Sequence, residues 1–287
     1  MRRLLLALAI LLVLLVGAAG ELLTHPIRRT LGPPPADLPQ AESVLITIPD
    51  GPTVSGWFVP GRPGMGAVLL LHGVRSDRSQ MLGRARFLSR LGHAALLIDL
   101  PAHGESGGDH ITFGLRESRG VTAALAYLAQ RLPAEKIGVI GVSLGAASTV
   151  MSQASPPPAA IVLESMYPTL ADAVAHRLDL HLGAGGHWLA PLLLWQLPLR
   201  LGFSADDLRP IDKLASLHAP LLIASGARDQ HTPRAETERL FQAAVEPKEL
   251  WIVDGAAHVD LHAFGPAAYE ARIEPFLARH LRQAPPP

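Results

Sequence analysis

The sequence predicts an α/β protein in which helices flank a mostly parallel, eight-stranded sheet and a short helical insertion interrupts the order. From Ser43 onward, short runs rich in leucine and β-branched residues alternate with longer amphipathic stretches, which is typical of such a sheet. A glycine-rich turn follows one of these runs directly and leads into a helical stretch. The chain has 287 residues, 48% of them hydrophobic, which is ample for one large core.

The strands are expected as one antiparallel hairpin followed by six parallel runs. The hairpin joins residues 43–48 to 53–59 through a turn at 49–52. The buried parallel strands are expected at residues 67–71, 94–98, 137–140, 160–163, 221–224 and 250–253. The helices between and after them are expected at residues 80–91, 116–131, 144–153, 234–245 and 267–281.

Residues 167–210 break this alternation and are expected to be a helical insertion. Within residues 188–203, 11 of the 16 residues are apolar and only Arg200 is charged. Such a surface needs a partner. The sequence leaves two interpretations open: the insertion packs onto the main core, or it forms a lid over a pocket.

The first 23 residues are expected to be a membrane anchor or a signal peptide. Arg2 and Arg3 precede an uncharged, apolar run at residues 4–20, long enough to reach the lower limit for a membrane-spanning helix. We favour a retained anchor that contacts the membrane through residues 4–20. The alternatives are cleavage near the small residues 18–20 and an internal core helix.

The remaining boundaries follow from composition. Residues 24–42 are proline-rich and are expected to form a linker that acts as a spacer between the membrane and a domain at 43–281, with a frayed tail at 282–287. The two arginines before the apolar run place the domain outside the cytoplasm by the positive-inside rule, although Arg28 and Arg29 weaken that orientation. Cleavage would give a secreted protein instead.

The charge balance and the cysteine count exclude several classes of function. The chain has 25 basic and 25 acidic residues and only 17% charged residues, so no footprint for nucleic acid is visible. It has no cysteine, which excludes a disulfide framework, a thiolate nucleophile and cysteine-ligated metals. We expect neither a metal nor a cofactor, and the sequence does not indicate the oligomeric state.

The glycine-rich turn carries a nucleophile motif. Residues 141–145 read Gly-Val-Ser-Leu-Gly, directly after the strand expected at 137–140 and before a helix. This G-x-S-x-G pattern is typical of a nucleophile elbow, in which a tight turn holds the serine in a strained conformation and exposes its hydroxyl. Gly141 and Gly145 are needed because side chains beside so tight a turn would collide. Ser143 is therefore the candidate nucleophile.

A serine nucleophile needs a base and a carboxylate that orients it. Asp229 follows the strand expected at 221–224, and His258 follows the strand at 250–253, so both lie at carboxyl ends, where open α/β sheets place their sites. Glu164, at the end of another strand, is an alternative acid. Asp254 and Asp260 are too close in sequence to His258 for the usual geometry.

With these residues in place, residues 43–281 resemble the α/β-hydrolase superfamily, in particular its membrane-anchored serine hydrolases often labelled serine aminopeptidase-like. The Leu-Leu-Leu-His-Gly run at 69–73 is similar to the family's oxyanion-loop motif. The run Asp-Leu-Pro-Ala-His-Gly-Glu-Ser at 99–106 is similar to its D-x-R-G-H-G-x-S motif, although Pro101 and Ala102 depart from the usual Arg-Gly.

The resemblance implies a role for each matching residue. Ser143 would be the nucleophile, His258 the base and Asp229 its partner, while the backbone amides of Val74 and Leu144 would form the oxyanion hole. The motif residues that support these positions are His72, Gly73, Gly141 and Gly145. The implied activity is hydrolysis of an ester, thioester or amide through an acyl-serine intermediate.

Several neighbouring residues have plainer interpretations. His72, His103, His231 and His262 are expected to be structural or surface residues, and Asp99 a structural carboxylate. Arg75 and Arg78 are expected to be solvated, with contact to an anionic leaving group as the alternative.

Two other functions are kept as alternatives. One is a long-chain acyl hydrolase or deacylase acting on membrane lipids or acylated proteins. The other is a catalytically silent binding module on the same fold. The expected partner is accordingly a small-molecule or lipid acyl substrate.

Overall fold

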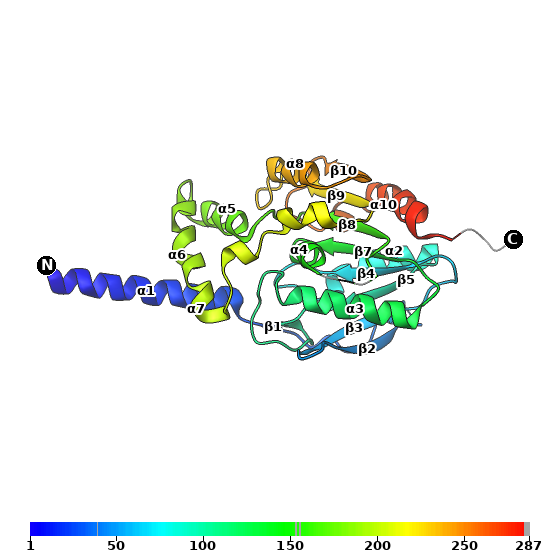
Figure 1. Cartoon of the computed structure of the whole chain (residues 1–287), viewed down its shortest axis with the longest axis horizontal. Helices are drawn as coiled ribbons and strands as arrows, with labels where there is room; N and C mark the ends of the chain where they lie inside the picture. Colours follow the sequence, from blue (N-terminus) through cyan, green and yellow to red (C-terminus); the bar gives the residue numbers. More distant parts are fainter. Residues whose placement is uncertain (39, 153, 155, 284–287) are drawn as a thin grey trace.

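The computed structural model describes residues 1–38, 40–152, 154 and 156–283, except for the side chain of Ala9. The end of the helix expected at 144–153 and most of the tail expected at 282–287 lie outside the described residues. Helices flank a central sheet, while one long helix, α1 (Arg2–Thr24), extends away from it (Figure 1).

The central sheet has eight strands in the order β10-β9-β8-β7-β4-β5-β3-β2. Strand β3 pairs antiparallel with both β2 and β5, and the other neighbours are parallel. The fold class predicted from the sequence is thus confirmed. The strands are β2 (Glu42–Thr47), β3 (Thr53–Val59), β4 (Ala67–Leu71), β5 (Ala94–Ile98), β7 (Ile137–Val142), β8 (Ala160–Glu164), β9 (Leu221–Gly226) and β10 (Lys248–Val253).

Helices cover both faces of the sheet, which explains why its central strands are apolar on both sides. Leu70 and Ile140 share a core cluster with residues of α2 and α10, whereas Leu69 and Val139 pack with residues of α3. Helices α4 and α8 continue the second layer over β8 and β9. The helices are α2 (Leu82–Leu91), α3 (Glu117–Arg131), α4 (Leu144–Met151), α8 (Arg234–Ala243), α9 (Leu261–Phe264) and α10 (Pro266–Leu281).

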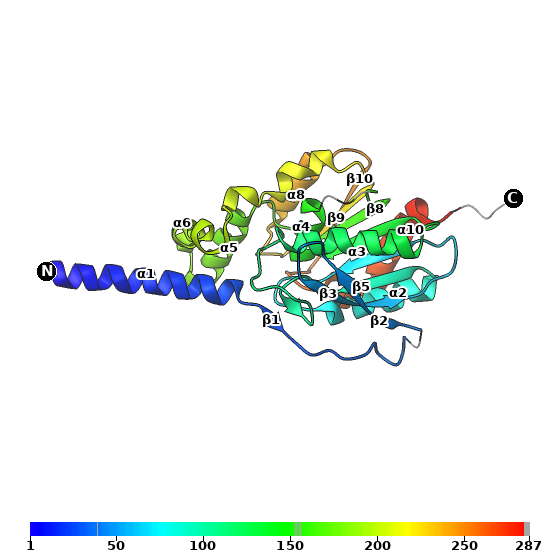
Figure 2. The same cartoon turned by 60° about the horizontal axis from the view of Figure 1, so that its bottom comes forward.

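The insertion after β8 folds into short helices that lie beside the end of α1 (Figures 1 and 2). It buries a small core of its own, which includes Leu197, Leu201 and Phe203. Other apolar side chains of the insertion, including Trp188 and Trp195, stay exposed. The elements are α5 (Leu170–Leu182), η2 (Gly186–Leu189), α6 (Ala190–Trp195), α7 (Leu197–Leu201), η3 (Ala205–Asp207) and η4 (Pro210–Ser216).

Helix α1 is, within the described part of the chain, the one helix long and apolar enough to cross a membrane by length and composition. Its 23 residues contain an 18-residue window with a mean hydropathy of 2.6, and only 6% of that window is buried. Its last turns contact α6 of the insertion. The apolar run at 4–20 is therefore helical, and most of its described side chains are exposed, which is incompatible with the alternative of a core helix.

The segment expected to be a spacer lies against the domain instead. We call residues 25–38 the strap, and Figure 2 shows it running along the outside of the domain from α1 toward β2. Strand β1 (Ile27–Arg28) pairs in parallel with β6 (His103–Gly104). At the far end, the side chain of Leu38 is buried in the main core. The backbone of the strap thus forms hydrogen bonds with the motif loop at residues 99–106, which contains β6.

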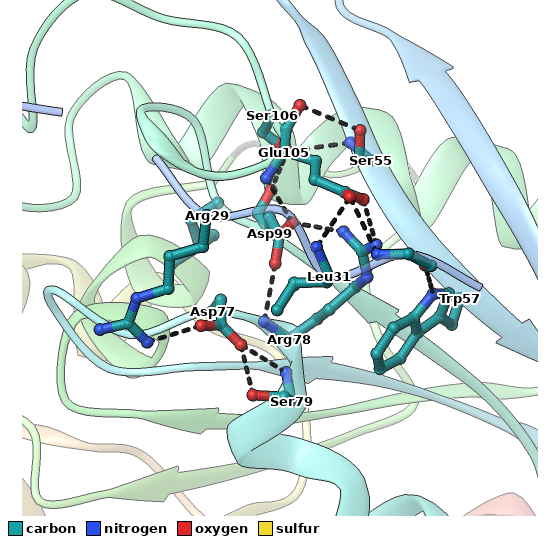
Figure 3. A network of polar contacts seen from close by, with 12 residues as sticks. Arg29, Leu31, Ser55, Trp57, Asp77, Arg78, Ser79, Asp99, Glu105 and Ser106 are labelled. Carbon is teal, nitrogen blue, oxygen red and sulfur yellow. Dashed lines mark hydrogen bonds and ion pairs between the residues drawn. The ribbon is translucent and has the colours of Figure 1, made fainter. Parts of the chain in front are cut away.

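Carboxylates of the domain bind the middle of the strap (Figure 3). Glu105 Oε1 accepts hydrogen bonds from the amides of Leu31 (2.9 Å) and Gly32 (3.1 Å). Asp77 Oδ2 pairs with the guanidinium of Arg29 at 2.7 Å. The buried guanidinium of Arg78 pairs with both Asp99 and Glu105, so one network joins the strap to the motif loop at 99–106. Arg78 is therefore neither solvated nor free to meet a leaving group.

Candidate active site

Ser143 stands at the turn between β7 and α4 in a conformation that side chains rarely adopt, with φ 50° and ψ −105°. A Cβ at Gly141 would meet the amide nitrogen of Ala146 at 2.6 Å, and one at Gly145 would meet the carbonyl oxygen of Leu71 at 2.6 Å. Both glycines are thus required by close backbone approach. The carbonyl of Glu164 accepts the Ser143 amide at 2.8 Å, which fixes the turn to β8.

Asp229 and His258 are joined by a hydrogen bond between Oδ2 and Nδ1, 2.8 Å long. The remaining acceptor capacity of Asp229 is filled by the amides of His231 (2.8 Å) and Thr232 (2.9 Å) and by the Thr232 hydroxyl (2.8 Å). Burial raises the pKa of Asp229, but the contacts with His258 and Thr232 outweigh burial and hold the pKa below its usual value. The carboxylate is therefore ionised at neutral pH.

This pairing sets the chemistry of His258. An ionised carboxylate accepts, so Nδ1 must carry the proton that joins the two groups, and Nε2 of the neutral ring is left as an acceptor. Ser143 and His258 line the same cavity. The arrangement places an orientated imidazole and a strained serine at one cavity wall.

Two buried histidines hold the loop that contains Val74. His72 Nε2 accepts the amide of Leu100 at 3.0 Å and its Nδ1 lies 2.7 Å from the carbonyl oxygen of Gly73. His103 Nε2 accepts the amide of Arg75 at 3.2 Å. Burial lowers the pKa of His72 to about 4 and that of His103 to about 3, so both rings are neutral at pH 7 and act as fixed hydrogen-bond partners.

The cavity has a volume of about 210 Å³ and is mostly apolar. Val74 and Leu144 line it next to Ser143, and the amide of Leu144, the first residue of α4, has no carbonyl partner within that helix. The opposite wall comes from the insertion and includes Tyr167, Leu170, Val174, Leu178 and Leu193. Leu23, from the last turn of α1, completes the lining. The insertion thus both forms its own core and covers the cavity.

The predicted site residues therefore gather at one place. Ser143, His258, Val74 and Leu144 line the cavity, and Asp229 binds His258 from behind. The supporting residues His72, Gly73, Gly141 and Gly145 lie in the two turns that carry them. Arg75 is exposed, as expected, and it also lines the cavity, as its alternative interpretation requires.

The rival acids lie in a separate network. Glu164 binds the guanidinium of Arg84 at 2.5 Å and the hydroxyl of Tyr269 at 2.5 Å, all three fully buried. Asp260 also pairs with Arg84, at 2.9 Å. His262 lies 3.3 Å from Glu270. These groups hold α2 and the C-terminal helices to the end of β8, and none of them lines the cavity.

Sequence reasoning missed several residues of the site. The hydroxyl and the amide of Thr232 both donate hydrogen bonds to the carboxylate of Asp229. The spacing Asp-x-x-Thr was the available signal in the sequence, because an aspartate side chain can accept hydrogen bonds from backbone groups a few residues further on. Gln80 accepts the amide of Gly73 at 2.8 Å. His231 stacks on His258 with ring centroids 4.8 Å apart. Burial, and to a smaller extent the charge of Arg177, lower the pKa of His231 to about 4. Arg177 itself lines the cavity.

Within the described residues, no group of three or more His, Asp or Glu side chains is placed to hold a metal ion. The chemistry that the site offers comes from the hydroxyl, the imidazole, the carboxylate and the loop amides.

These features define the class of protein. The sheet is mostly parallel, a strained serine follows the central strand β7, and an Asp–His pair lies at the carboxyl ends of the neighbouring strands β9 and β10. The family model described as the alpha/beta hydrolase family matches residues 68–272, and the chain belongs to this family. The uncharacterized protein Rv2307c of Mycobacterium tuberculosis is 34% identical over 226 residues, covering 78% of this chain and 74% of the relative. The uncharacterized protein YqkD of Bacillus subtilis is 23% identical over 244 residues, covering 83% and 80%.

Solved structures give the same class. The Pyrococcus furiosus esterase Pf2001 has a TM-score of 0.74 and 26% identity, covering 90% of this chain and all of that one. The alpha/beta hydrolase GrgF from Penicillium has a TM-score of 0.65 at 21% identity, covering 84% and 99%. The chain is thus an alpha/beta hydrolase whose structure is similar to that of an esterase.

Proposed function

We propose that this protein is a serine hydrolase that cleaves acyl esters, with thioesters and amides as chemically related substrates, through an acyl-serine intermediate. The observation that carries the proposal is the strained Ser143 in one cavity with His258, whose Nδ1 is bound to the ionised Asp229. The similarity to the Pyrococcus furiosus esterase favours esters.

In the proposed reaction, His258 Nε2 takes the hydroxyl proton as Ser143 Oγ attacks the acyl carbonyl carbon. The amides of Val74 and Leu144 stabilise the negative charge on the carbonyl oxygen. The bond to the leaving group breaks, and His258 returns the proton to the departing oxygen, nitrogen or sulfur. A water molecule, deprotonated by the same imidazole, then hydrolyses the acyl-serine and frees the acid.

A fluorophosphonate probe tests the proposal, because it phosphonylates an activated serine and not an ordinary one. We expect the full-length protein in detergent to be labelled at Ser143 and to hydrolyse p-nitrophenyl esters. Ser143→Ala should abolish labelling and lower kcat by about 10⁴-fold or more. Ser148→Ala, in the helix that follows Ser143, is the matched control.

Folded protein that is not labelled, or that is labelled equally after Ser143→Ala, would contradict the proposal. A silent binding module on this fold would then be the better interpretation.

A further inference from the structure

The last turn of α1 forms part of the candidate active site. Leu23 lines the main cavity, and it also lines a small adjoining cavity of about 30 Å³ between α1 and the insertion. The two cavities share Leu23, Phe113, Leu170, Val174 and Leu193. The cavity at Ser143 and the cavity beside α1 are therefore neighbours, separated by side chains that are mostly apolar.

Polar contacts fix this end of α1 to the insertion. Arg200 pairs with Glu21 and donates to Thr24 Oγ1 at 3.3 Å, while Gln196 Nε2 donates to the carbonyl of Val16 at 3.0 Å. Gly20 permits the approach, because a Cβ there would meet Gln196 Oε1 at 2.0 Å. These contacts span two turns of α1, so its position against the insertion is defined at more than one point.

The motif loops hold the same turn from the other side. The carbonyl of Thr24 accepts the amide of Ile111 at 2.8 Å, and the carbonyl of Leu22 accepts from the Arg75 guanidinium at 3.2 Å. Arg75 follows Val74, whose amide belongs to the proposed oxyanion hole. The end of α1 is thus connected to both walls of the cavity.

The insertion, whose helix α6 contacts α1, also exposes large apolar side chains. Trp188, Trp195 and Leu199 are 78%, 69% and 75% exposed, respectively, and helix α6 contacts α1 (Figures 1 and 2). An exposed apolar helix that can cross a membrane requires lipid around it, and tryptophans are enriched where lipid meets water. A bilayer around α1 would therefore also cover this face of the insertion.

We propose that the pocket between α1 and the insertion binds the long acyl chain of an ester that resides in the bilayer, and that the chain enters from the lipid side past Leu23. This inference rests on the proposed function, since it names the substrate class of the same serine. Water supplies the hydroxyl of the released fatty acid and the proton of the released alcohol. The acyl carbonyl lies at Ser143 and the chain runs toward α1.

Substitution of Leu23 tests the pocket. In phosphatidylcholine vesicles, Leu23→Trp should lower the ratio of kcat/KM for p-nitrophenyl laurate to that for the acetate by about tenfold, the loss expected when roughly two methylene groups are displaced from an apolar pocket. Leu22→Trp is the matched control, because Leu22 is 66% exposed on the same turn and lines neither cavity. It should leave the ratio unchanged. Equal ratios for the two variants would overturn the proposal.

Lipid contact is measured separately and without altering the pocket. In vesicles of dibrominated dioleoyl-phosphatidylcholine, tryptophan fluorescence of the full chain should fall by roughly one-third relative to unbrominated vesicles. The double variant W188F/W195F should lose this quenching, because Trp57 is buried and Trp251 packs against the core. Quenching that is absent, or that persists in the double variant, would overturn the lipid-side entry.

The two proposals fail in different ways. Folded wild-type protein that the fluorophosphonate probe does not label at Ser143 would overturn the hydrolase proposal. Normal labelling with a laurate preference that Leu23→Trp does not change would overturn only the acyl pocket.

Discussion

At the scale of single residues, backbone strain gathers around the candidate site. Five residues other than glycine have positive φ in the loops around it: Arg75 at 60°, Ala102 at 65°, Phe113 at 53°, Ser143 at 50° and Ser165 at 48°. Each such conformation costs roughly 1–3 kcal/mol and persists only where surrounding contacts determine it. Here those contacts are the fixed acceptors of His72 and His103, the carbonyl of Glu164 and the glycines beside Ser143. Of these strained residues, Ser143, Arg75 and Phe113 line the cavity.

Asp229→Asn should separate the role of this carboxyl from that of Glu164. The amide nitrogen of asparagine donates, so His258 would present Nδ1 as an acceptor and lose the free Nε2 that takes the serine proton. We expect kcat on a p-nitrophenyl ester to fall by about 10³–10⁴-fold with the fold retained, as judged by circular dichroism. Near-normal turnover in this variant would show that another group orientates His258.

Arg84 and Glu164 should matter for stability instead. Arg84→Met leaves the carboxylate of Glu164 buried without its cation, which typically costs about 3–5 kcal/mol. Urea unfolding should show this loss in the free energy of unfolding. The double variant R84M/E164Q should recover part of it, because the fully buried carboxylate is then neutral and only the partly exposed Asp260 lacks its cation. A midpoint for Arg84→Met equal to that of the wild type would argue against the network.

At the scale of elements, the local sequence pattern was sufficient to predict the strands of the sheet but not the structure of the strap. Strands such as β4 are uniformly apolar because both faces are covered, so their runs stand out in the sequence. Strand β1 has two residues in a proline-rich segment, and its partner β6 lies more than 70 residues away. No local periodicity reports such a pairing. Likewise, the helix expected from residue 80 begins at Leu82, because the cap at Asp77 first starts a 3₁₀ turn.

The contact between α8 and α5 is expected to depend on pH. Glu236 of α8 is buried, and burial together with the charge of Asp172 raises its pKa to about 7. His176 Nδ1 lies 3.3 Å from its Oε1, and the charges of Arg239 and Asp229 act on it as well. A raised pKa in the folded state contributes stability that is complete below the unfolded value of 4.5 and is lost as the pH rises through 7.

Glu236→Gln should remove this pH dependence. Between pH 5 and pH 8 the wild type should lose about 2.5 kcal/mol more free energy of unfolding than the variant, which carries no proton to lose. Urea titrations at the two pH values measure the difference. Glu238→Gln, on the exposed face of the same helix, is the control and should track the wild type. Parallel pH profiles for wild type and Glu236→Gln would contradict the expectation.

At the scale of the whole molecule, the candidate site combines parts that the sequence does and does not predict. Motif spacing placed Ser143, Asp229 and His258 at carboxyl ends of strands, because the fold fixes where those ends meet. The other cavity wall depends on how the insertion packs on Leu23, a contact between segments about 150 residues apart. Only tertiary structure shows that α1 and the insertion form one surface.

Truncation from the N-terminal side should separate membrane association from stability. Deleting residues 2–17 removes most of the apolar helix, including the Val16 carbonyl that Gln196 contacts, but keeps Glu21, Thr24 and the strap. The protein should therefore lose flotation with vesicles while its Tm falls only slightly. Deleting residues 2–38 also removes the β1–β6 pairing, the ion pair to Asp77 and buried Leu38. Burial of one leucine alone contributes about 1.5–3 kcal/mol, so the Tm should fall by at least roughly 5 °C. Thermal unfolding in the same detergent compares the two deletions, and equal Tm values would show that the strap adds no stability to the domain.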